Sequence, residues 1–220
     1  MLERILLQNT VHGAELGIFI STTFEILLET LEKKKKQLTL RSTGTKLAQA
    51  SCNARGHLFI ANNALYILKT IEEYIRENNE TTQPESLLQV AHCVKQRYED
   101  AVDAFCSAGW DIVMTHVSPI EEESLQFTKG KITFDSGRLL KTRFENFNSD
   151  LEELLAVEKR FSVPDSILRA KLRVRIANKF IPHAEFFERF STIPFSKKHQ
   201  EQYLRYSPKV IQSLISSLFI

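Results

Sequence analysis

The sequence predicts an all-α protein, in the form of an elongated rod of stacked antiparallel helical bundles. Its 220 residues include only seven Gly and six Pro, widely scattered, so few turns are obligatory. Apolar residues recur at spacings of three and four along most of the chain, as on one face of a helix. No segment has a strand pattern strong enough for a sheet. Long helices joined by short polar turns are typical of antiparallel bundles.

Three helices are predicted in the first half of the chain. The first ends in four lysines at residues 33–36, cations that a helix C-terminus favours. This lysine run is either a solvated helix end or a contact with lipid head groups. A second helix covers residues 45–75, and a third covers residues 84–117, where a proline and an acid suit the first turn. The single tryptophan, Trp110, is expected in the core.

The helical pattern breaks over residues 121–137, where an alternating stretch lies between two glycines. We expect a loop between helices here, with a short hairpin as the alternative. The helical period then returns over residues 139–157, which predicts a fourth long helix.

Start and stop signals divide the C-terminal quarter. Pro164 followed by Asp165 predicts a new helix with proline at its first position and an acid in its first turn. That helix meets Pro182, which should kink it. Ser207 and Pro208 repeat the start signal as the N-cap and first residue of the last helix.

A chain of this length can bury a core as one or two domains. We expect a helical bundle over residues 1–120 and a C-terminal helical bundle with a basic end over residues 121–220. No apolar run approaches the roughly 18 residues that span a bilayer, and the start has no signal-peptide pattern, so a cytoplasmic protein is predicted. Three cysteines, an odd number in helical pattern, favour reduced, buried thiols over a disulfide framework.

Charge is unevenly distributed along the chain. Residues 169–220 hold ten Lys or Arg and three acids, a net +7, whereas residues 1–168 hold 19 and 24, a net −5. The total of +2 therefore hides a polarised molecule. Such asymmetry predicts an anionic partner, either a membrane surface or a nucleic acid; the structural alternative is a solvated basic helix face.

Aromatic residues accompany these cations. A cluster of phenylalanines lies among them, made up of Phe180, Phe186, Phe187 and Phe190. Exposed, they would form a wedge for a membrane or for stacking bases, but their helical spacing beside Pro182 favours the core. Tyr203 and Tyr206 fit a bundle end and a lipid interface equally well, because each has an apolar body and a polar tip.

Several pieces of the chain, in order, carry a resemblance to a known family. In the C-terminal half they are Lys141, Arg143, Phe144, Asn146, Phe147 and Asn148, then residues 163–165, 181–182 and 202–208. In the N-terminal half they are residues 10–12 and 59–67, with Tyr98 and Trp110. Together they resemble the C-terminal region of the family of exocyst complex component seven, the seventy-kilodalton exocyst subunit, and they cover nearly the whole chain.

The resemblance implies an all-helical rod of stacked bundles with no known catalytic activity and no cofactor. Members of this family tether secretory vesicles to the plasma membrane and bind phosphatidylinositol 4,5-bisphosphate through their C-terminal end. The implied partners are other exocyst subunits, a small GTPase of the Rho class and an anionic phosphoinositide membrane. The implied location is cytoplasmic and peripheral, at the inner face of the plasma membrane.

The sequence departs from the family in two respects. The family's closing motif, Asn-Pro-Glu-Lys-Tyr-Ile-Lys-Tyr, has two lysines that help to bind lipid. Here Gln202 replaces the first lysine, and Arg205 keeps a cation at the second. The family protein is also far longer, so this chain is either a C-terminal fragment or a shortened relative.

The predicted lipid-binding residues are six cations of the basic quarter: Lys171, Arg175, Lys197, Lys198, Arg205 and Lys209. Attraction to head groups is a summed field, on the order of 1 kcal/mol for each basic residue near the surface, so neighbouring lysines can compensate for Gln202. The guanidinium of Arg205 can also hold a phosphate through two hydrogen bonds.

Two other classes of function stay open. One is a helical protein-interaction scaffold for a GTPase or tether subunits that has lost lipid binding, with Gln202 as the visible sign. The other is nucleic-acid binding by the same basic end, but no recognised motif accompanies the charge. Enzymatic function is not predicted, because the chain has neither a Gly-rich phosphate loop nor a helical His-x-x-x-His pair, and His12 has no partner nucleophile.

Overall fold

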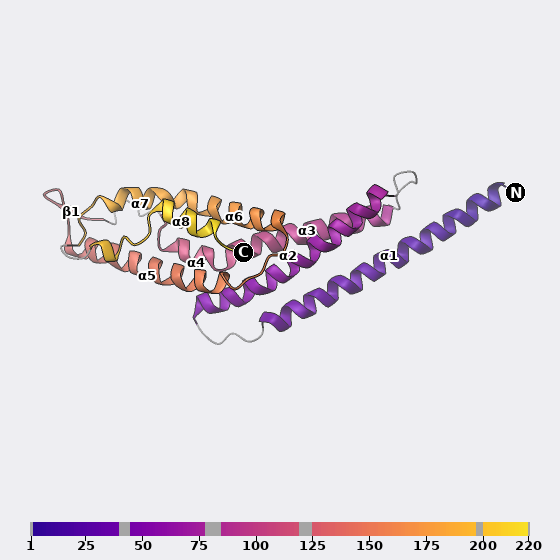
Figure 1. The fold of residues 1–220 in the computed structure, drawn as a ribbon, viewed down its shortest axis with the longest axis horizontal. Coiled ribbons are helices and arrows are strands. Elements are labelled where there is room, and N and C mark those ends of the chain that lie inside the picture. Colours follow the sequence, from indigo (N-terminus) through magenta and orange to yellow (C-terminus); the bar gives the residue numbers. More distant parts are fainter. Residues whose placement is uncertain (1, 40–44, 78–84, 119–124, 197–199, 220) are drawn as a thin grey trace. The chain divides into compact units, whose positions relative to one another are not determined.

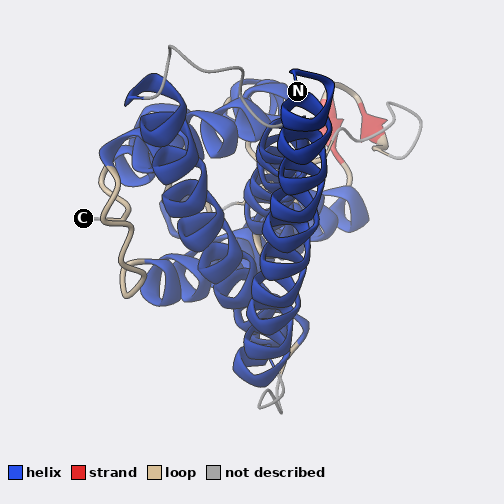
Figure 2. Cartoon of the chain, turned by 90° about the vertical axis from the view of Figure 1, so that its right-hand side faces the viewer, coloured by secondary structure: helices blue, strands red, loops and turns tan. Residues whose placement is uncertain are grey.

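The computed structural model describes residues 2–39, 45–77, 85–118, 125–196 and 200–219, with side chains from Gly17 onward. These ranges are almost entirely helical (Figures 1 and 2). The helices are α1 (Leu2–Thr39), α2 (Lys46–Glu77), α3 (Glu85–Ala108), α4 (Trp110–Thr115), α5 (Phe134–Glu158), α6 (Ser166–Phe180), α7 (Ala184–Ser191) and α8 (Pro208–Ser216). The other elements are strands β1 (Phe127–Thr128) and β2 (Lys131–Ile132) and 3-10 turns η2 (Ile181–His183) and η3 (Gln200–Gln202). The predicted all-α class is confirmed, and stacking into a rod stays a prediction.

Two compact units divide these elements between them. Unit 1 contains Met1–Ser42 and Arg55–Phe105, and unit 2 contains Thr43–Ala54 and Cys106–Ile220. The first turns of α2 therefore belong to unit 2, and the rest of α2 belongs to unit 1. The predicted boundary between residues 120 and 121 lies outside the described residues and stays a prediction.

Unit 1 is built from α1, most of α2 and most of α3. Its core is formed by apolar side chains spaced three and four apart, among them Leu58, Ala61, Ala64, Leu68, Ile71, Val94, Ala101 and Phe105. Gly56 marks a close approach of α2 to α1, since a Cβ atom there would lie 2.8 Å from Thr39 Cγ2. The first two predicted helices are confirmed: α1 continues past the lysine run, and α2 agrees with residues 45–75 to within two residues at each end.

The third predicted helix, by contrast, is not continuous. It is interrupted at Gly109, because α3 ends at Ala108 and α4 begins at Trp110. Glycine weakens a helix interior. Gly109 also lets Leu154 of α5 pack closely, because a Cβ atom at this position would clash with Leu154 Cδ1 at 2.5 Å. Trp110 itself is completely buried, as predicted.

Residues 127–132, shortly before α5, form the short hairpin that was the alternative to a loop. β1 and β2 pair antiparallel, with Phe127 opposite Ile132 and Thr128 opposite Lys131. The two-residue turn places Lys129 at φ 52° and Gly130 at φ 72°, and positive φ at both positions matches the right-handed twist of a hairpin. The prediction of a loop was therefore wrong for residues 127–132, because the turn closes tightly enough for the two strands to pair.

Helix starts in unit 2 follow the predicted signals with one correction. Asp165 is the N-cap of α6 and accepts hydrogen bonds from the N–H groups of Ile167 and Leu168, each at 2.9 Å. Asp165 thus lies outside the first turn, and Pro164 precedes the cap. The prediction for α8 is confirmed, with Ser207 as N-cap and a proline at the first position. Pro182 interrupts the helix as a 3-10 turn between α6 and α7.

All three cysteines are free thiols. Cys106 is buried and Cys52 is half-buried, but Cys93 is exposed, so the expectation of burial was wrong for Cys93. None of the helices in the described part of the chain combines the length and the apolar run that crossing a bilayer requires.

Candidate functional site

A cluster of aromatic rings positions the C-terminal loop of unit 2. Phe180, Phe186, Phe187 and Phe190 are all at most 4% exposed, so their predicted place in the core is confirmed. Phe144 of α5 lies 5.2 Å from Phe186 and 5.4 Å from Phe195 between ring centroids, and it is stacked on Phe195. Phe195 in turn meets Tyr203 edge-on at 6.0 Å. The loop after α7 is therefore fixed to α5 by ring contacts.

Two polar side chains of α5 complete this attachment. Asn148 is buried and donates its amide N–H to the carbonyl oxygen of Tyr203 at 3.0 Å. Arg143 donates from Nε to the carbonyl of His116 and from Nη2 to the carbonyl of Ser118, each at 2.7 Å. Its guanidinium also lies 5.1 Å from the ring centre of Phe186. Arg143 thus satisfies carbonyl groups at the end of α4 and has a structural role.

Arg205, the predicted phosphate clamp, is held by a carboxylate. Its Nη1 lies 2.9 Å from Oε1 of Glu152, and its Nε donates to the carbonyl of Gln202 at 3.2 Å. The hydroxyl of Tyr206 donates to the same Glu152 oxygen at 2.9 Å. Burial and this hydrogen bond raise the pKa of Tyr206, so the phenol keeps its proton. Since the Arg205 and Glu152 side chains are 53% and 45% exposed, an anion can reach the guanidinium from solvent.

A shallow cavity of about 300 Å³ lies beside Arg205. Its lining residues include Glu145, Glu152, Gln202 and Arg205. The position of the missing family lysine, Gln202, therefore does share a site with Arg205. Two carboxylates and one cation line it, however, so the cavity itself does not concentrate positive charge.

The other predicted cations lie elsewhere in unit 2. Lys171 and Arg175 are half-buried on α6, and Lys209 is exposed in the first turn of α8, which contacts α6. Of the described cations among the six, only Arg205 lines the cavity beside Glu152. Lys197 and Lys198 lie outside the described residues.

Lys209 occupies an unfavourable place for a cation. It follows Ser207 and Pro208 at the start of α8, where the helix dipole favours acids. No acid lies in that first turn. A positive charge kept at this end makes the surface attractive to anions at a small expense in helix stability.

The sequence analysis did not identify Glu152 as part of the site, nor the polar face of α5 on which it lies. Lys141, Glu145, Asn148 and Glu152 recur at spacings of four and three on α5, and this spacing places them on one helix face. Lys141 lies 5.9 Å from the ring centre of Tyr203, and it lines a neighbouring groove of about 730 Å³ together with Arg138. The helical spacing could have revealed the shared face, but not the partner of Glu152 in a distant loop.

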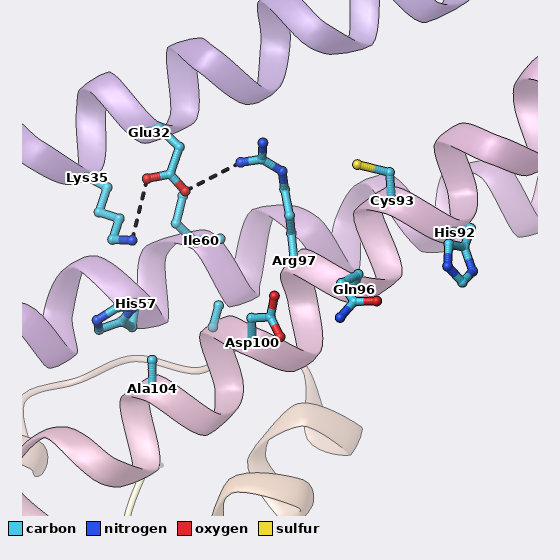
Figure 3. Close-up of a pocket in the computed structure, with 11 residues that line it drawn as sticks. Glu32, Lys35, His57, Ile60, His92, Cys93, Gln96, Arg97, Asp100 and Ala104 are labelled. Carbon is cyan, nitrogen blue, oxygen red and sulfur yellow. Dashed lines mark ion pairs between the residues drawn. The ribbon is translucent and has the colours of Figure 1, made fainter.

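Unit 1 contains a separate, mixed-charge pocket of about 670 Å³ (Figure 3). Glu32 of α1 lies 3.6 Å from Arg97 of α3 and 3.4 Å from Lys35, so these charges offset one another. Burial, followed by the charge of Lys35, lowers the pKa of His57 and favours its neutral form. Within the described ranges, no three His, Cys, Asp or Glu residues are grouped to hold a metal ion. The pocket therefore offers neither a strong field nor a metal site.

Comparison with known proteins shows which family the chain belongs to. Residues 5–217 match the family described as the C-terminal region of the Exo70 protein of the exocyst complex. The chain belongs to the Exo70 family. The resemblance inferred from the ordered sequence pieces is thus confirmed.

Relatives of this Exo70 chain are similar at modest identity. Exocyst complex component 7 of Drosophila melanogaster is 28% identical over 194 residues, covering 86% of this chain and 26% of the fly protein. Exocyst complex component 7 of Homo sapiens is 28% identical over 168 residues, covering 74% and 21%. Exocyst complex component EXO70 of Saccharomyces cerevisiae is 22% identical over 208 residues, covering 94% and 32%. The chain thus spans between 21% and 32% of the length of these relatives.

Packing accounts for several residues that carried the Exo70 resemblance. Phe144, Phe147 and Asn148 are at most 4% exposed. Phe144 and Asn148 join α5 to the C-terminal loop, and Phe147 packs against Phe187 of α7. The exposed positions around them, such as Gln202, are less constrained by packing and can change charge without disturbing the core.

Proposed function

We propose that this chain is a vesicle-tethering module of exocytosis that binds anionic phosphoinositides through unit 2 and does so without catalysis. The observation that carries the proposal is the charge of residues 169–220, +7, within a chain of the Exo70 family. The proposed lipid is phosphatidylinositol 4,5-bisphosphate, at the cytoplasmic face of the plasma membrane. The proposed protein partners are other exocyst subunits and a small GTPase of the Rho class.

The proposed binding residues are the six cations Lys171, Arg175, Lys197, Lys198, Arg205 and Lys209. Their contribution is a summed attraction, which does not require them to line one cavity. The exposure of Lys209 at a helix start, where its charge disfavours the helix, supports a role outside folding. Arg205 adds directed hydrogen bonds, since its guanidinium can exchange the exposed carboxylate of Glu152 for a lipid phosphate.

Liposome co-sedimentation tests the proposal. Vesicles of phosphatidylcholine, of phosphatidylcholine with phosphatidylserine, and of phosphatidylcholine with phosphatidylinositol 4,5-bisphosphate are compared at about physiological salt, where charge is screened beyond roughly 8 Å. We expect strong sedimentation with the phosphoinositide vesicles only. Replacement of Lys197, Lys198 and Arg205 by alanine should remove most of this binding.

A matched control separates a specific surface from total charge. Lys33, Lys34 and Lys36 are exposed lysines of α1, and their replacement by alanine removes the same number of charges from unit 1. This control variant should still bind. Equal losses in both triple variants would show that net charge alone drives the interaction, and an unaffected C-terminal variant would refute the assignment of the site.

A second candidate function is a protein-interaction scaffold that has lost lipid binding. Two observations favour it: the neutral Gln202, and the ion pair that already engages Arg205 with Glu152. A chain that ignores all three vesicle types but binds exocyst subunits or a GTPase of the Rho class would support this candidate over lipid binding. Salt dependence gives a further distinction, because head-group binding weakens steeply with ionic strength.

A further inference from the structure

The groove of about 730 Å³ in unit 2 is lined by two cations, and none of its described lining residues is an acid. Arg138 and Lys141 are three residues apart on α5, a spacing that places both on one face of the helix. Residues 125–141 hold four Lys or Arg and a single acid, Asp135, which does not line the groove. The cavity beside Arg205 differs, because two carboxylates line it. The larger groove is therefore the better place for an anion.

Packing holds the walls of the groove in place. A Cβ atom at Gly137 of α5 would lie 3.0 Å from the carbonyl oxygen of Phe195, so the helix and the loop after α7 approach closely here. The ring of Phe195 is stacked on Phe144, and the ammonium of Lys141 lies 5.9 Å from the ring centre of Tyr203. The groove thus exists before a ligand arrives, which keeps the entropy lost on binding small.

Two exposed phenylalanines adjoin the groove. Phe134 lines it and is 82% exposed. Phe127 is 49% exposed and pairs in the hairpin with Ile132, which also lines the groove. Residues directly opposite in an antiparallel pair share one face of the sheet, so Phe127 lies on the same face as Ile132. The hairpin itself lies at the edge of unit 2 (Figure 2).

Hydrogen bonds fix the backbone that carries these rings. The hydroxyl of Thr133 accepts from the N–H of Ser136 and caps α5, which makes Phe134 the first residue of the helix. The N–H of Gln126 donates to the hydroxyl oxygen of Ser136 at 2.9 Å, and the N–H of Thr133 donates to the carbonyl of Gln126 at 2.9 Å. The hairpin is therefore tied to the start of α5. Apolar rings kept in water on such a frame are typical of an interaction site.

We propose that the groove binds the phosphorylated head group of an anionic lipid while Phe127 and Phe134 enter the bilayer surface beside it. This inference rests on the proposed binding of unit 2 to phosphoinositide membranes, and it adds a head-group site and an apolar anchor outside the six cations. Arg138 can hold a phosphate through two N–H groups, and Lys141 adds a point charge. Cations beside exposed apolar rings suit the bilayer interface, where phosphates lie next to acyl chains.

The two rings favour a lipid over a soluble phosphate compound. A soluble phosphate would neutralise the cations but leave both rings in water. A membrane gains from both features, because burial of apolar surface and attraction to anionic head groups add to one another. The groove is also lined by Ser196, which directly precedes the predicted lipid-binding residues Lys197 and Lys198 in the sequence. The two predicted surfaces are therefore adjacent along the chain.

Quenching by brominated lipids tests the insertion. Phe134→Trp adds an exposed reporter, since Trp110, the single tryptophan of the chain, is completely buried. With vesicles of brominated phosphatidylcholine and phosphatidylinositol 4,5-bisphosphate, the added fluorescence should shift to shorter wavelength and be quenched. Phe127→Trp should give the same result. The matched control is Leu88→Trp, at an exposed apolar residue of unit 1, whose fluorescence should change in neither respect.

Co-sedimentation with the same phosphoinositide in unbrominated vesicles tests the groove. Replacing Arg138 and Lys141 together by alanine should weaken binding about thirtyfold, from the usual contribution of two basic residues near a membrane surface. Phe134→Ser should weaken it about tenfold. The control replaces Lys33 and Lys36, exposed cations with the same spacing on α1, and should bind like the unaltered chain. Thermal unfolding checks that each variant is folded.

The possible failures separate this inference from the proposed function. Vesicle binding in which Phe134→Trp is neither shifted nor quenched, or equal losses in the two double variants, would overturn the groove and leave phosphoinositide binding by unit 2 intact. Soluble inositol 1,4,5-trisphosphate that binds as tightly as the vesicles would overturn the insertion. A chain that sediments with none of the vesicles would overturn both the inference and the proposed function.

Discussion

Trp110 donates its indole N–H to both carboxyl oxygens of Glu158, at 3.0 and 3.1 Å, in the interior of unit 2. Glu158 is 1% exposed at the end of α5. Burial raises the pKa of Glu158 from its usual 4.5 to about 8, although the hydrogen bond from Trp110 opposes the shift. Near neutral pH the folded chain therefore holds this carboxyl protonated, whereas the unfolded chain ionises it.

The first prediction concerns the pH dependence of stability. Between pH 4.5 and about 8 the folded state binds one proton more than the unfolded state at Glu158, so the free energy of unfolding falls as pH rises through this window. The loss is on the order of a few kcal/mol. Glu158→Gln keeps an acceptor for Trp110 but cannot ionise. Urea unfolding at several pH values should show stability decreasing between pH 5 and pH 8 relative to this variant, and parallel profiles would contradict the raised pKa.

The second prediction concerns thiol reactivity. Burial, with a smaller contribution from the charge of Glu158, raises the pKa of Cys106 to about 12, so this thiol has almost no thiolate near neutral pH. Cys93 is exposed and should react first with an aromatic disulfide reagent, followed by Cys52. Cys106 should react only after unfolding. Mass spectrometry of the labelled peptides identifies the sites, and early labelling at Cys106 would show that its pocket opens in the folded chain.

The third prediction concerns the carboxylate that engages Arg205. Glu152→Gln should release the guanidinium and strengthen binding to phosphoinositide vesicles by up to about fivefold, since an exposed ion pair contributes about 0.2–1 kcal/mol. Glu153→Gln is the control, because it removes the same charge from the same exposed stretch of α5 without touching Arg205. Equal gains in the two variants would assign the effect to net charge.

The fourth prediction concerns Lys209. Lys209→Glu should stabilise the chain by about 0.3–1 kcal/mol, because an acid suits the first turn of α8, while it weakens vesicle binding. Lys159→Glu makes the same charge change at the C-cap of α5, where a cation is favourable, and should lower stability instead. Thermal unfolding and co-sedimentation are measured on both variants. A stabilised Lys209→Glu chain with unchanged vesicle binding would remove Lys209 from the lipid site.

The fifth prediction concerns the aromatic junction, the ring contacts by which Phe144 of α5 holds α7 and the loop after it. Phe144→Ala should lower the free energy of unfolding by about 3–5 kcal/mol, because Phe144 is 1% exposed and contacts three other rings. Phe134 lies at the start of the same helix but is 82% exposed. Phe134→Ala should therefore change stability little. Comparable losses in urea unfolding would mean that Phe134 is covered in solution.

Local signals predicted the elements of this fold better than the contacts between them. The helical period identified α1, α2 and α5, and Ser207 with Pro208 located the start of α8, because these features depend on neighbouring residues. The interruption at Gly109 depends on Leu154 in another helix, and no local pattern contains that information. The hairpin depends on a two-residue turn in which Lys129 adopts a positive φ that its residue type rarely takes.

In the candidate site, too, local features could be predicted from the sequence and contacts between distant residues could not. Sequence identified the basic quarter and Arg205 as one of its cations, since charge and composition are local, and the role of Arg205 in lipid binding stays a prediction. It could not identify Glu152 as the partner of both Arg205 and Tyr206, because these residues come together only through the aromatic junction. By residue type Tyr203 was equally suited to a bundle end and a lipid interface, and the sequence could not show that its ring contacts Phe195.

The attachment of Arg143 to the end of α4 has a consequence for the order of folding. α4 has six residues, and helices shorter than about 12 residues are marginal alone in water. Its terminal carbonyls are bound by a side chain from α5, which lies later in the sequence. We expect α5 to form early and α4 to form only upon it, so the folding nucleus of unit 2 should include α5 and exclude α4.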